Sequence, residues 1–351
     1  MSKNKVTIYD VASSLGLSTA TVNRVINHKP NVSERTRKLV LKAVEEMGYR
    51  PSKTASSLSR TPIHISVLIN ASISDFHSEI ERGAKKALED LFDFNVRGLV
   101  RVIKKMPTAD DFIKAMREEA DNGADAIAIV SHKDEPTVIK EMRKLSQRGI
   151  KFAVGVSEIN EGCNTFSVKS NGYIAGRMAG ELLENMLKTG KVAIILGDKG
   201  TDVHDSCLSG FEKYVEESAL EFVGYYESHE DVKISAKLAD VLFEEHPDIS
   251  GVYISSANSL GFLNRLEEID KTHDIKVITS DIFPALAEFL DRQTANASIF
   301  QNPFLTGKLL VEYLYENITQ VGKFQNKVIK TDPQVVLNTN KELFLRHMQE
   351  Q

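Results

Sequence analysis

The chain has 351 residues, of which 42% are hydrophobic and 26% charged, and its formal net charge is −5 at pH 7. This composition is typical of a globular protein and argues against a disordered or collagen-like chain. No apolar run approaches the ~20 residues of a membrane span, and the N-terminus lacks the apolar core of a secretory signal, so we expect a cytoplasmic protein without a membrane partner. Two cysteines, Cys163 and Cys207, cannot form a disulfide framework or, alone, a metal site. We therefore expect no metal and no cofactor.

The charge is distributed unevenly along the chain. Residues 1–60 contain eleven Lys and Arg but four Asp and Glu, a net charge of +7, and the remaining residues carry −12. A basic N-terminal region favours nucleic-acid binding, because phosphate neutralisation supplies most of the non-specific affinity for DNA. A basic surface that is merely solvated is the alternative.

Residues 1–50 predict a small bundle of three helices. Thr7 and Asp10 have the spacing of a capping box, and apolar residues follow at helical spacing until Gly16. Ser18 is a good N-cap for a second helix, and Ser33 for a third, which ends at Gly48. A helix, a short turn containing glycine and a second helix form a helix-turn-helix pattern.

The predicted second helix carries the sharpest functional signal of the chain. No acidic residue lies between Gly16 and Asn31, and small residues at the helix start allow a close approach to a major groove. Asn and Arg side chains offer bidentate hydrogen bonds to base edges or contacts to phosphates. The outward positions are Thr19, Ala20, Asn23, Arg24 and Asn27. These features favour DNA binding over a three-helix bundle that merely has a polar face.

Residues 51–61 read as a linker, because the stretch 52–59 has one large apolar side chain, Leu58, among many hydroxyls. Such a stretch cannot bury enough apolar surface to fold alone. From residue 62 onward the pattern alternates between short β-rich runs and amphipathic helical stretches. The run 124–130 is almost continuously apolar, as a strand buried on both faces requires. We expect an α/β fold with two similar parallel-sheet lobes and a ligand cleft at the carboxyl ends of the strands.

The first sixty residues closely resemble the DNA-binding domain of the LacI/GalR family. The match covers residues 6–60 and includes TIYDVA, LSTATVNRVIN, VSERTRKLV and GYRPSKTASSL. This resemblance implies a hinge helix that forms on DNA, with Leu58 as a minor-groove wedge. Asn23 departs from the usual Ser, which leaves the operator sequence open. The residues assigned to DNA contact are Thr7, Tyr9, Ser18, Thr19, Ala20, Thr21, Asn23, Arg24, Asn27, Ser33, Thr36, Lys53, Ala55 and Leu58.

The rest of the chain resembles the family's effector domain, which has the type I periplasmic-binding-protein fold. This implies one lobe of about residues 62–164 with 298–325, a second of about 165–297 with 326–340, and a C-terminal tail at 341–351. Sugar hydroxyls need Asp, Asn and Gln partners, and the ring face needs an aromatic plate. The expected effector residues are Asn70, Phe76, Ser131, Asn171, Cys207, Asn258, Asp281 and Gln301. Cys207 stands where the family usually has an Arg, so either the ligand differs from a simple hexose or another residue, His204 or Arg177, substitutes for it.

Taken together, these features predict a transcription regulator, more specifically a repressor. We expect a homodimer on a palindromic operator, because one helix-turn-helix domain makes few base contacts, and a sugar-like effector in the cleft. A sugar-binding carrier is the alternative, which the basic N-terminal region opposes. An enzyme is disfavoured because the sequence has no phosphate loop, zinc motif or nucleophile elbow.

Overall fold

The computed structural model describes residues 6–26, 30–48, 61–70, 74–103, 108–131, 135–158, 166–320 and 327–349. The chain divides into two compact units, one of residues 1–62 with 91–95 and the other of residues 63–90 with 96–351. The helical domain of residues 6–48 is here called the head, and the second unit is called the body. No helix in the described ranges is long and apolar enough to cross a membrane.

The head contains the three predicted helices, α1 (Ile8–Leu15), α2 (Thr19–Ile26) and α3 (Glu34–Glu46). Thr7 and Asp10 form the expected capping box of α1, and the Ser33 side chain caps α3. The helices enclose a small apolar core with fully buried side chains at its centre, which are Val11, Val22, Val25 and Val40. This confirms the helix-turn-helix prediction, because the apolar positions at helical spacing are the ones that pack inward.

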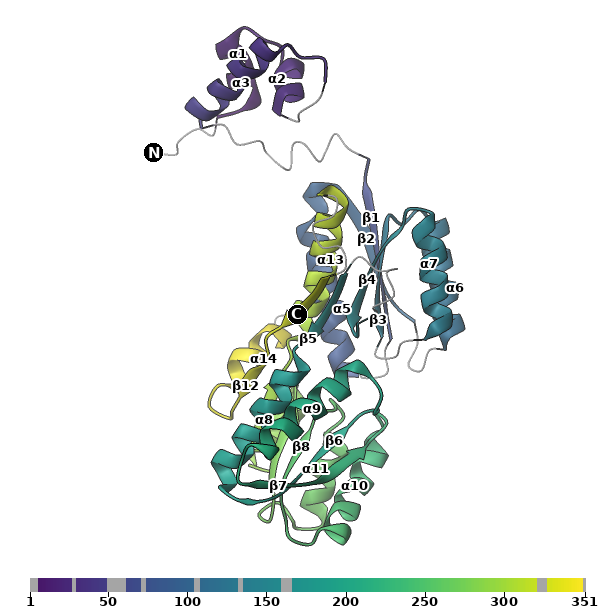
Figure 1. Cartoon of the computed structure of the whole chain (residues 1–351), viewed down its shortest axis with the longest axis vertical. Helices are drawn as coiled ribbons and strands as arrows, with labels where there is room; N and C mark the ends of the chain where they lie inside the picture. The colour runs from purple at the N-terminus through teal and green to yellow at the C-terminus, as the bar shows by residue number, and fades with distance from the viewer. Residues whose placement is uncertain are drawn as a thin grey trace. The chain divides into compact units, whose positions relative to one another are not determined.

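The first lobe of the body is a parallel sheet of six strands in the order β11-β5-β4-β3-β1-β2. Its strands are β1 (Ile63–Ile69), β2 (Val96–Val102), β3 (Ala126–Ser131), β4 (Lys151–Val156), β5 (Phe166–Ser170) and β11 (Lys327–Thr331). Helices cover both faces (Figure 1): α5 (Ser74–Asp90) and α13 (Pro303–Thr319) lie on one, and α6 (Ala109–Asp121) and α7 (Pro136–Gln147) on the other. A short 3-10 helix, η1 (Phe92–Phe94), precedes β2 in the chain.

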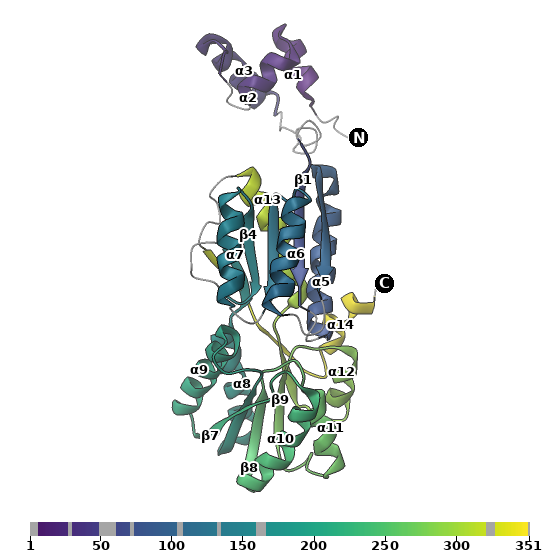
Figure 2. The same cartoon turned by 90° about the vertical axis from the view of Figure 1, so that its right-hand side faces the viewer.

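The second lobe has the strand order β12-β10-β9-β8-β6-β7, and the pair β10–β12 is antiparallel. Its strands are β6 (Gly190–Leu196), β7 (Leu220–Glu227), β8 (Ile249–Ile254), β9 (Lys276–Ser280), β10 (Ala297–Phe300) and β12 (Gln334–Val336). One core joins the sheet to α8 (Gly172–Leu187) and α9 (Asp202–Glu216). A second core, on the other face (Figure 2), joins it to α10 (Val232–Glu245), α11 (Leu260–Glu268), α12 (Pro284–Asp291) and α14 (Lys341–Gln349).

Glycines allow two pairs of helices to cross closely. A Cβ atom on Gly83 of α5 or Gly307 of α13 would lie 1.9 or 2.0 Å from a backbone oxygen of the facing helix. A Cβ on Gly176 of α8 or Gly210 of α9 would lie 2.1 or 2.0 Å from one. Such contacts are far shorter than any van der Waals distance, so these glycines are needed for packing.

The chain passes between the lobes three times, after β5, after β10 and after β11. Hydrogen bonds join the three crossings to one another. The Asn171 backbone N–H donates to Thr331 O over 3.1 Å, and the Thr331 hydroxyl donates to Gln301 O over 3.1 Å. A change at one crossing is thereby transmitted to the other two.

The α/β architecture with two parallel-sheet lobes is confirmed, but the predicted lobe boundaries are wrong at three strands. β10 belongs to the second sheet, whereas the expected division placed residues 298–325 in the first lobe. β5 and β11 belong to the first sheet, whereas the expected division placed residues 165–170 and 327–331 in the second lobe. The predicted tail is also wrong, because α14 packs on the second lobe through Leu345, which is 4% exposed, and Lys341 pairs with Asp291 of α12. The sequence pattern also missed α11 and α12.

Candidate functional site

The head presents a polar face along α2 and the turn before it. Ser18, Ala20, Asn23 and Arg24 are exposed, and Thr19 and Thr21 are partly exposed. The Ser18 hydroxyl accepts a hydrogen bond from the Thr21 backbone N–H over 3.1 Å, so it caps the helix and fixes where it begins. The predicted outward positions of α2 are thus accessible, and the apolar positions between them fill the core.

Three other hydroxyls predicted to contact DNA have partners within the head. Thr7 Oγ1 donates to Asp10 Oδ2 over 2.7 Å, and the side-chain and backbone hydrogen bonds from Thr7 lower the pKa of the Asp10 carboxyl. The Ser33 and Thr36 hydroxyls lie 2.7 Å apart at the start of α3. The Tyr9 side chain lies on α1 and is 73% exposed. The remaining predicted DNA contacts lie outside the described residues; they are Asn27, Lys53, Ala55 and Leu58.

The body contains a cleft of about 710 Å³, its open mouth included, which is lined from both lobes. The first lobe contributes side chains from α5, β4, β5 and α13, and the second from α8, α9 and the segments that follow β7 and β8. This is the carboxyl-end location expected for ligands in parallel sheets. The lining residues are Phe76, Val156, Lys169, Ser170, Gly172, Asp202, Val203, His204, Ser206, Glu230, Ser255, Ala257, Gln301 and Thr306.

An ion-pair cluster crosses the cleft. Lys169 of β5 donates through Nζ to Glu158 Oε2 of its own lobe and to Asp202 Oδ2 of the second lobe, each over 2.6 Å. The Lys169 side chain is only 9% exposed. Burial alone would lower the pKa of this ammonium, but the hydrogen bonds to Asp202 and Glu158 outweigh it, so the pKa is raised. Lys169 therefore stays charged and links the lobes.

A second polar network lies on the second lobe's side of the cleft. Glu230 accepts hydrogen bonds from Ser256 Oγ over 2.6 Å, from Asn258 Nδ2 over 3.1 Å and from His204 Nε2 over 3.1 Å. The Gly197 backbone N–H donates to His204 Nδ1 over 3.4 Å, so a neutral ring with its proton on Nε2 satisfies both contacts. A carboxylate is thereby held rigidly at the cleft wall.

Two of the predicted effector residues, Phe76 and Gln301, line the cleft. Asp281 lies behind Gln301, accepting hydrogen bonds from the Gln301 backbone N–H over 2.9 Å and from Nε2 over 3.0 Å. Asp281 is fully buried, and this burial raises the pKa of its carboxyl to about 7, although the bonds from Gln301 act to lower it. The geometry makes Asp281 the residue that orients Gln301.

Other predicted effector residues do not line the cleft. Asn171 caps α8 through a hydrogen bond from the Ile174 backbone N–H, and Asn258 donates to Glu230. Asn70 and Ser131, at the ends of β1 and β3, are also absent from the described lining. Of the two substitutes considered for the missing Arg, His204 lines the cleft, whereas Arg177 pairs with Glu217 at 3.0 Å.

The assignment of Cys207 to the effector site is wrong. Its side chain is 5% exposed, packs in the core between α8, α9 and the sheet, and lies 3.6 Å from Tyr253 Oη. Burial raises the pKa of the thiol to about 12. At residue 207 α9 faces the core, so a side chain there has no access to the cleft.

Sequence reasoning missed several residues that line the cleft, among them Lys169, Ser170, Asp202 and Glu230. Ser170 ends β5, Asp202 opens α9, and Glu230 lies three residues after β7. The rule that ligands bind at the carboxyl ends of strands points to these positions, but β5 was not recognised as a strand. Ser170 Oγ is buried and has no hydrogen-bond partner among the described residues, so it is available to a ligand.

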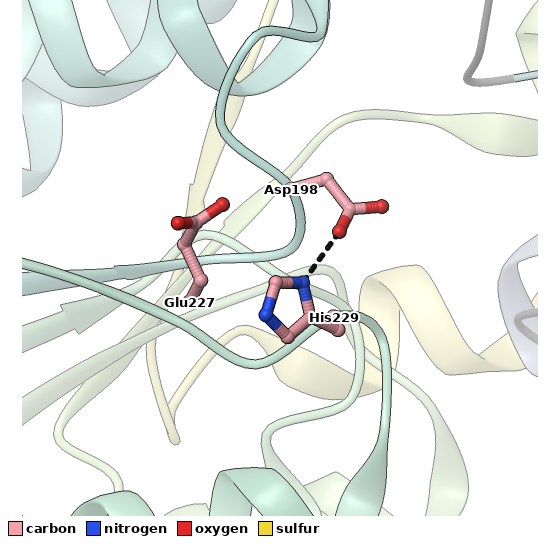
Figure 3. Close-up of side chains that lie close together, drawn as sticks. All are labelled: Asp198, Glu227 and His229. Carbon is pink, nitrogen blue, oxygen red and sulfur yellow. Dashed lines mark hydrogen bonds and ion pairs between the residues drawn. The ribbon is translucent and has the colours of Figure 1, made fainter.

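Figure 3 shows three further side chains that approach one another beside β6 and β7, which are Asp198, Glu227 and His229. His229 Nδ1 lies 2.7 Å from Asp198 Oδ1, and Glu227 Oε1 accepts the Lys199 backbone N–H over 2.7 Å. Each of the three side chains has an atom of a type that can bind a metal ion, and these atoms lie within 4.8 Å of one another. The sequence did not predict this cluster. Each of the three side chains already has a hydrogen-bond partner within the protein.

Comparison with known families agrees with this two-part architecture. Residues 7–52 match the bacterial regulatory proteins of the lacI family, and residues 65–323 match the periplasmic binding protein domain. The chain belongs to the lacI family. It is therefore a DNA-binding transcription regulator, as the exposed face of α2 predicted.

Relatives of this lacI-family regulator match along most of its length. Catabolite control protein A of Priestia megaterium is 23% identical over 85% of this chain and 96% of its own. The ribose operon repressor of Halalkalibacterium halodurans is 29% identical over 71% of each chain. The HTH-type transcriptional repressor PurR of Vibrio vulnificus is 26% identical over 94% of this chain and 97% of its own.

Solved structures resemble the body. A glucose-galactose binding protein from Geobacillus stearothermophilus covers 80% of this chain and 99% of its own, with a TM-score of 0.71 and 21% identity. A solute-binding protein from Bacillus halodurans, solved with myo-inositol, covers 81% of this chain and 97% of its own, with a TM-score of 0.71 and 18% identity. At these identities the likeness shows the shared fold.

Proposed function

We propose that this regulator is a repressor that binds a palindromic operator as a homodimer and responds to a small sugar or polyol in the body's cleft. The observation that carries the proposal is the presence, on one chain, of an acid-free exposed helix face and of a polar cleft built between two lobes. The first suits duplex DNA, and the second suits a small hydroxylated ligand. A DNA-binding helix does not require a ligand cleft, nor a cleft such a helix, so their presence on one chain points to a regulator that responds to a ligand.

On the DNA side, Ala20, Asn23 and Arg24 are placed to read base edges in the major groove. Ser18, Thr19 and Thr21 surround the start of α2, where small hydroxyl side chains contact the DNA backbone. Further contacts to the DNA backbone come from Thr7, Tyr9, Ser33 and Thr36. The hydroxyls of Thr7 and Ser33 also cap helices, so they contribute by fixing where α1 and α3 begin. Asn27 extends the face, and Lys53, Ala55 and Leu58 form the minor-groove contact of the linker.

On the effector side, Phe76 supplies an apolar plate and Gln301, Ser170, Asp202 and Glu230 supply hydrogen-bonding groups. This mixture suits a sugar ring, which has an apolar C–H face and a rim of hydroxyls. Support comes from the ribose operon repressors among the relatives. Proteins with the same fold bind glucose or galactose, arabinose and myo-inositol.

The two sites communicate through the lobes. A ligand that touches both walls of the cleft favours one lobe angle, and the hydrogen-bonded crossings transmit that angle along the body. If the effector and the operator each bind one lobe angle more tightly than the other, their binding is coupled. The coupling free energy between two such sites is typically ~1–3 kcal/mol. Binding of the operator and binding of the effector must shift each other by the same factor.

The decisive experiment selects duplexes from a random library with the full-length protein and then titrates the best duplex by fluorescence anisotropy. We expect one palindromic consensus, binding that weakens steeply with salt, and an affinity that changes when the cleft ligand is added. Analytical ultracentrifugation of the complex should give two chains per duplex. Equal affinity for the selected and random duplexes would overturn the proposal.

A further inference from the structure

The charged groups of the cleft determine which ligands can enter it. Four ionisable side chains line it among the described residues, namely Lys169, Asp202, His204 and Glu230. The ammonium of Lys169 already has two carboxylates at 2.6 Å, those of Glu158 and Asp202. Its positive charge is therefore more than neutralised, and this cluster carries a formal charge of −1.

Glu230 adds a second negative charge to the same cleft. Its side chain is 8% exposed, and its three side-chain donors, Ser256, Asn258 and His204, stabilise the carboxylate form. The neutral tautomer of His204 that satisfies the Gly197 N–H brings no compensating charge. With His204 counted as neutral, the four ionisable lining residues carry a formal charge of −1, and Glu158, which pairs with Lys169, brings it to −2.

At α9, two usual means of holding an anion, a free helix N-terminus and an Arg side chain, are occupied or absent. The N-terminus of a helix attracts anions, but α9 begins with Asp202, and Asp205 also lies in its first turn. Residue 207, where the family resemblance leads one to expect an Arg, is a buried Cys.

We propose that this cleft selects against anionic effectors, and that Asp202 and Glu230 are the specificity-determining residues. The effector is a polyhydroxylated molecule that has no phosphate or carboxylate, and an amine in its place is tolerated. A like charge about 5 Å from a carboxylate at an effective dielectric constant of ~25–50 weakens binding roughly tenfold to a hundredfold. The inference rests on the proposed function, because it takes the cleft to be the effector site.

The test compares matched ligands on full-length protein by calorimetry and by the midpoint of thermal unfolding. One set is galactose, galactosamine, galacturonate and galactose 6-phosphate; others pair ribose with ribose 5-phosphate and myo-inositol with inositol 1-phosphate. We expect at least one uncharged or amino member to bind, with its acidic counterpart at least tenfold weaker. The combined variant Asp202→Asn, Glu230→Gln should narrow that difference about tenfold or more.

The matched control is Asp248→Asn, which removes a negative charge from an exposed ion pair with Lys191 in the second lobe, outside the cleft lining. It should leave the difference unchanged. Tighter binding of a phosphate or carboxylate member, or an unchanged difference in the double variant, would overturn the inference. If such an anion also changes operator affinity, the proposed function stands and only the charge selection fails. If no member of any set binds, both fail.

Discussion

The head and the cleft place their functional residues in opposite ways. In the head, the candidate contact face lies on one helix of eight residues, α2, and on the turn before it. In the cleft, the lining residues extend from Phe76 to Thr306 and come from both sheets. A contiguous site is encoded by local periodicity, whereas a dispersed site exists only once the strand order is known. Accordingly, the predicted outward positions of α2 that the structure describes are accessible, whereas two of the eight predicted effector residues, Phe76 and Gln301, line the cleft.

The largest effect that tests this contrast is expected from Arg24→Ala. Loss of a bidentate contact costs roughly 1–3 kcal/mol of discrimination at each head, so a dimer with two heads should lose about 2–6 kcal/mol of operator binding free energy. Anisotropy titration against the selected duplex measures it. Because the cleft belongs to another unit, the affinity for the effector measured without DNA should be unchanged.

Lys42→Ala is the matched control for this prediction. It removes a positive charge from α3, where Lys42 is exposed and lies 3.7 Å from Glu46. We expect a small, salt-dependent loss that is equal for operator and random DNA. If both variants lost affinity equally on the two duplexes, α2 would not be the helix that reads sequence.

The next effect concerns the packing that the dispersed site depends on. Gly83→Ala places a Cβ 1.9 Å from a backbone oxygen of α13, so α5 and α13 must separate. Overpacking of this kind costs about 2–3 kcal/mol, and the loss should appear in the unfolding of the body, measured by urea titration of tyrosine fluorescence. Because the head belongs to a separate unit, the affinity of the folded full-length variant for random DNA should be unaffected.

Gly123→Ala is the comparison for that variant. A Cβ there meets nothing within 4 Å, and only the positive φ of 89° opposes it, which costs about 1 kcal/mol. A loss for Gly83→Ala no larger than that for Gly123→Ala would show that the helices tolerate separation. A role in ligand binding, and not helix packing, would then have to account for the glycine at position 83.

Local patterns predicted most of the fold. Capping residues gave the three helices of the head to within one or two residues, and apolar runs such as 124–130 gave the parallel strands. β5 was missed because its polar residues Ser167, Lys169 and Ser170 obscure the pattern, although Ser167 and Lys169 are buried. Lys169 is buried only because Glu158 and Asp202 approach it from two lobes. Periodicity does not encode this kind of compensation.

The same limit explains the cleft residues that were chosen wrongly. Conspicuous polar residues after strands were chosen, but Asn171 and Asn258 have structural partners that only tertiary contacts reveal. Cys207 was chosen by motif position, yet its helix turns that position toward the core. Phe76 and Gln301, which do line the cleft, were predicted from the family resemblance and not from local periodicity.

A further effect is expected in the pH dependence of the body's stability. The pKa of Asp281 is about 7 when folded and ~3.9 in an unfolded chain, so between these values the folded state binds one proton more. The free energy of unfolding should therefore fall as pH rises from about 4 to 7, by at most roughly 1.4 kcal/mol per pH unit, and become level above 7. Urea titrations at several pH values measure it.

Asp281→Asn should remove this slope, since the amide does not titrate in that range. Glu141 does not interfere, because its hydrogen bond from Arg117 outweighs burial and holds the pKa of the carboxyl at about 2. Its stabilising contribution is lost only as pH falls below ~4.5. A wild-type slope that persists in Asp281→Asn would mean that another group carries it, and Asp281 would then be ionised at the lobe crossing.

The smallest effect is expected at Cys207, where motif position and structure disagree. Because the side chain packs in the core against Tyr253, Cys207→Ala should cost about 1 kcal/mol of stability. It should change the affinity for whichever ligand binds the cleft by no more than about twofold. Peptide mapping after iodoacetamide treatment should find Cys207 unmodified in the folded protein and modified in urea, because burial keeps the thiol protonated and covered. Rapid modification that the ligand prevents would instead place residue 207 at the cleft. The family resemblance would then have identified a cleft residue that the packing of α9 does not reveal.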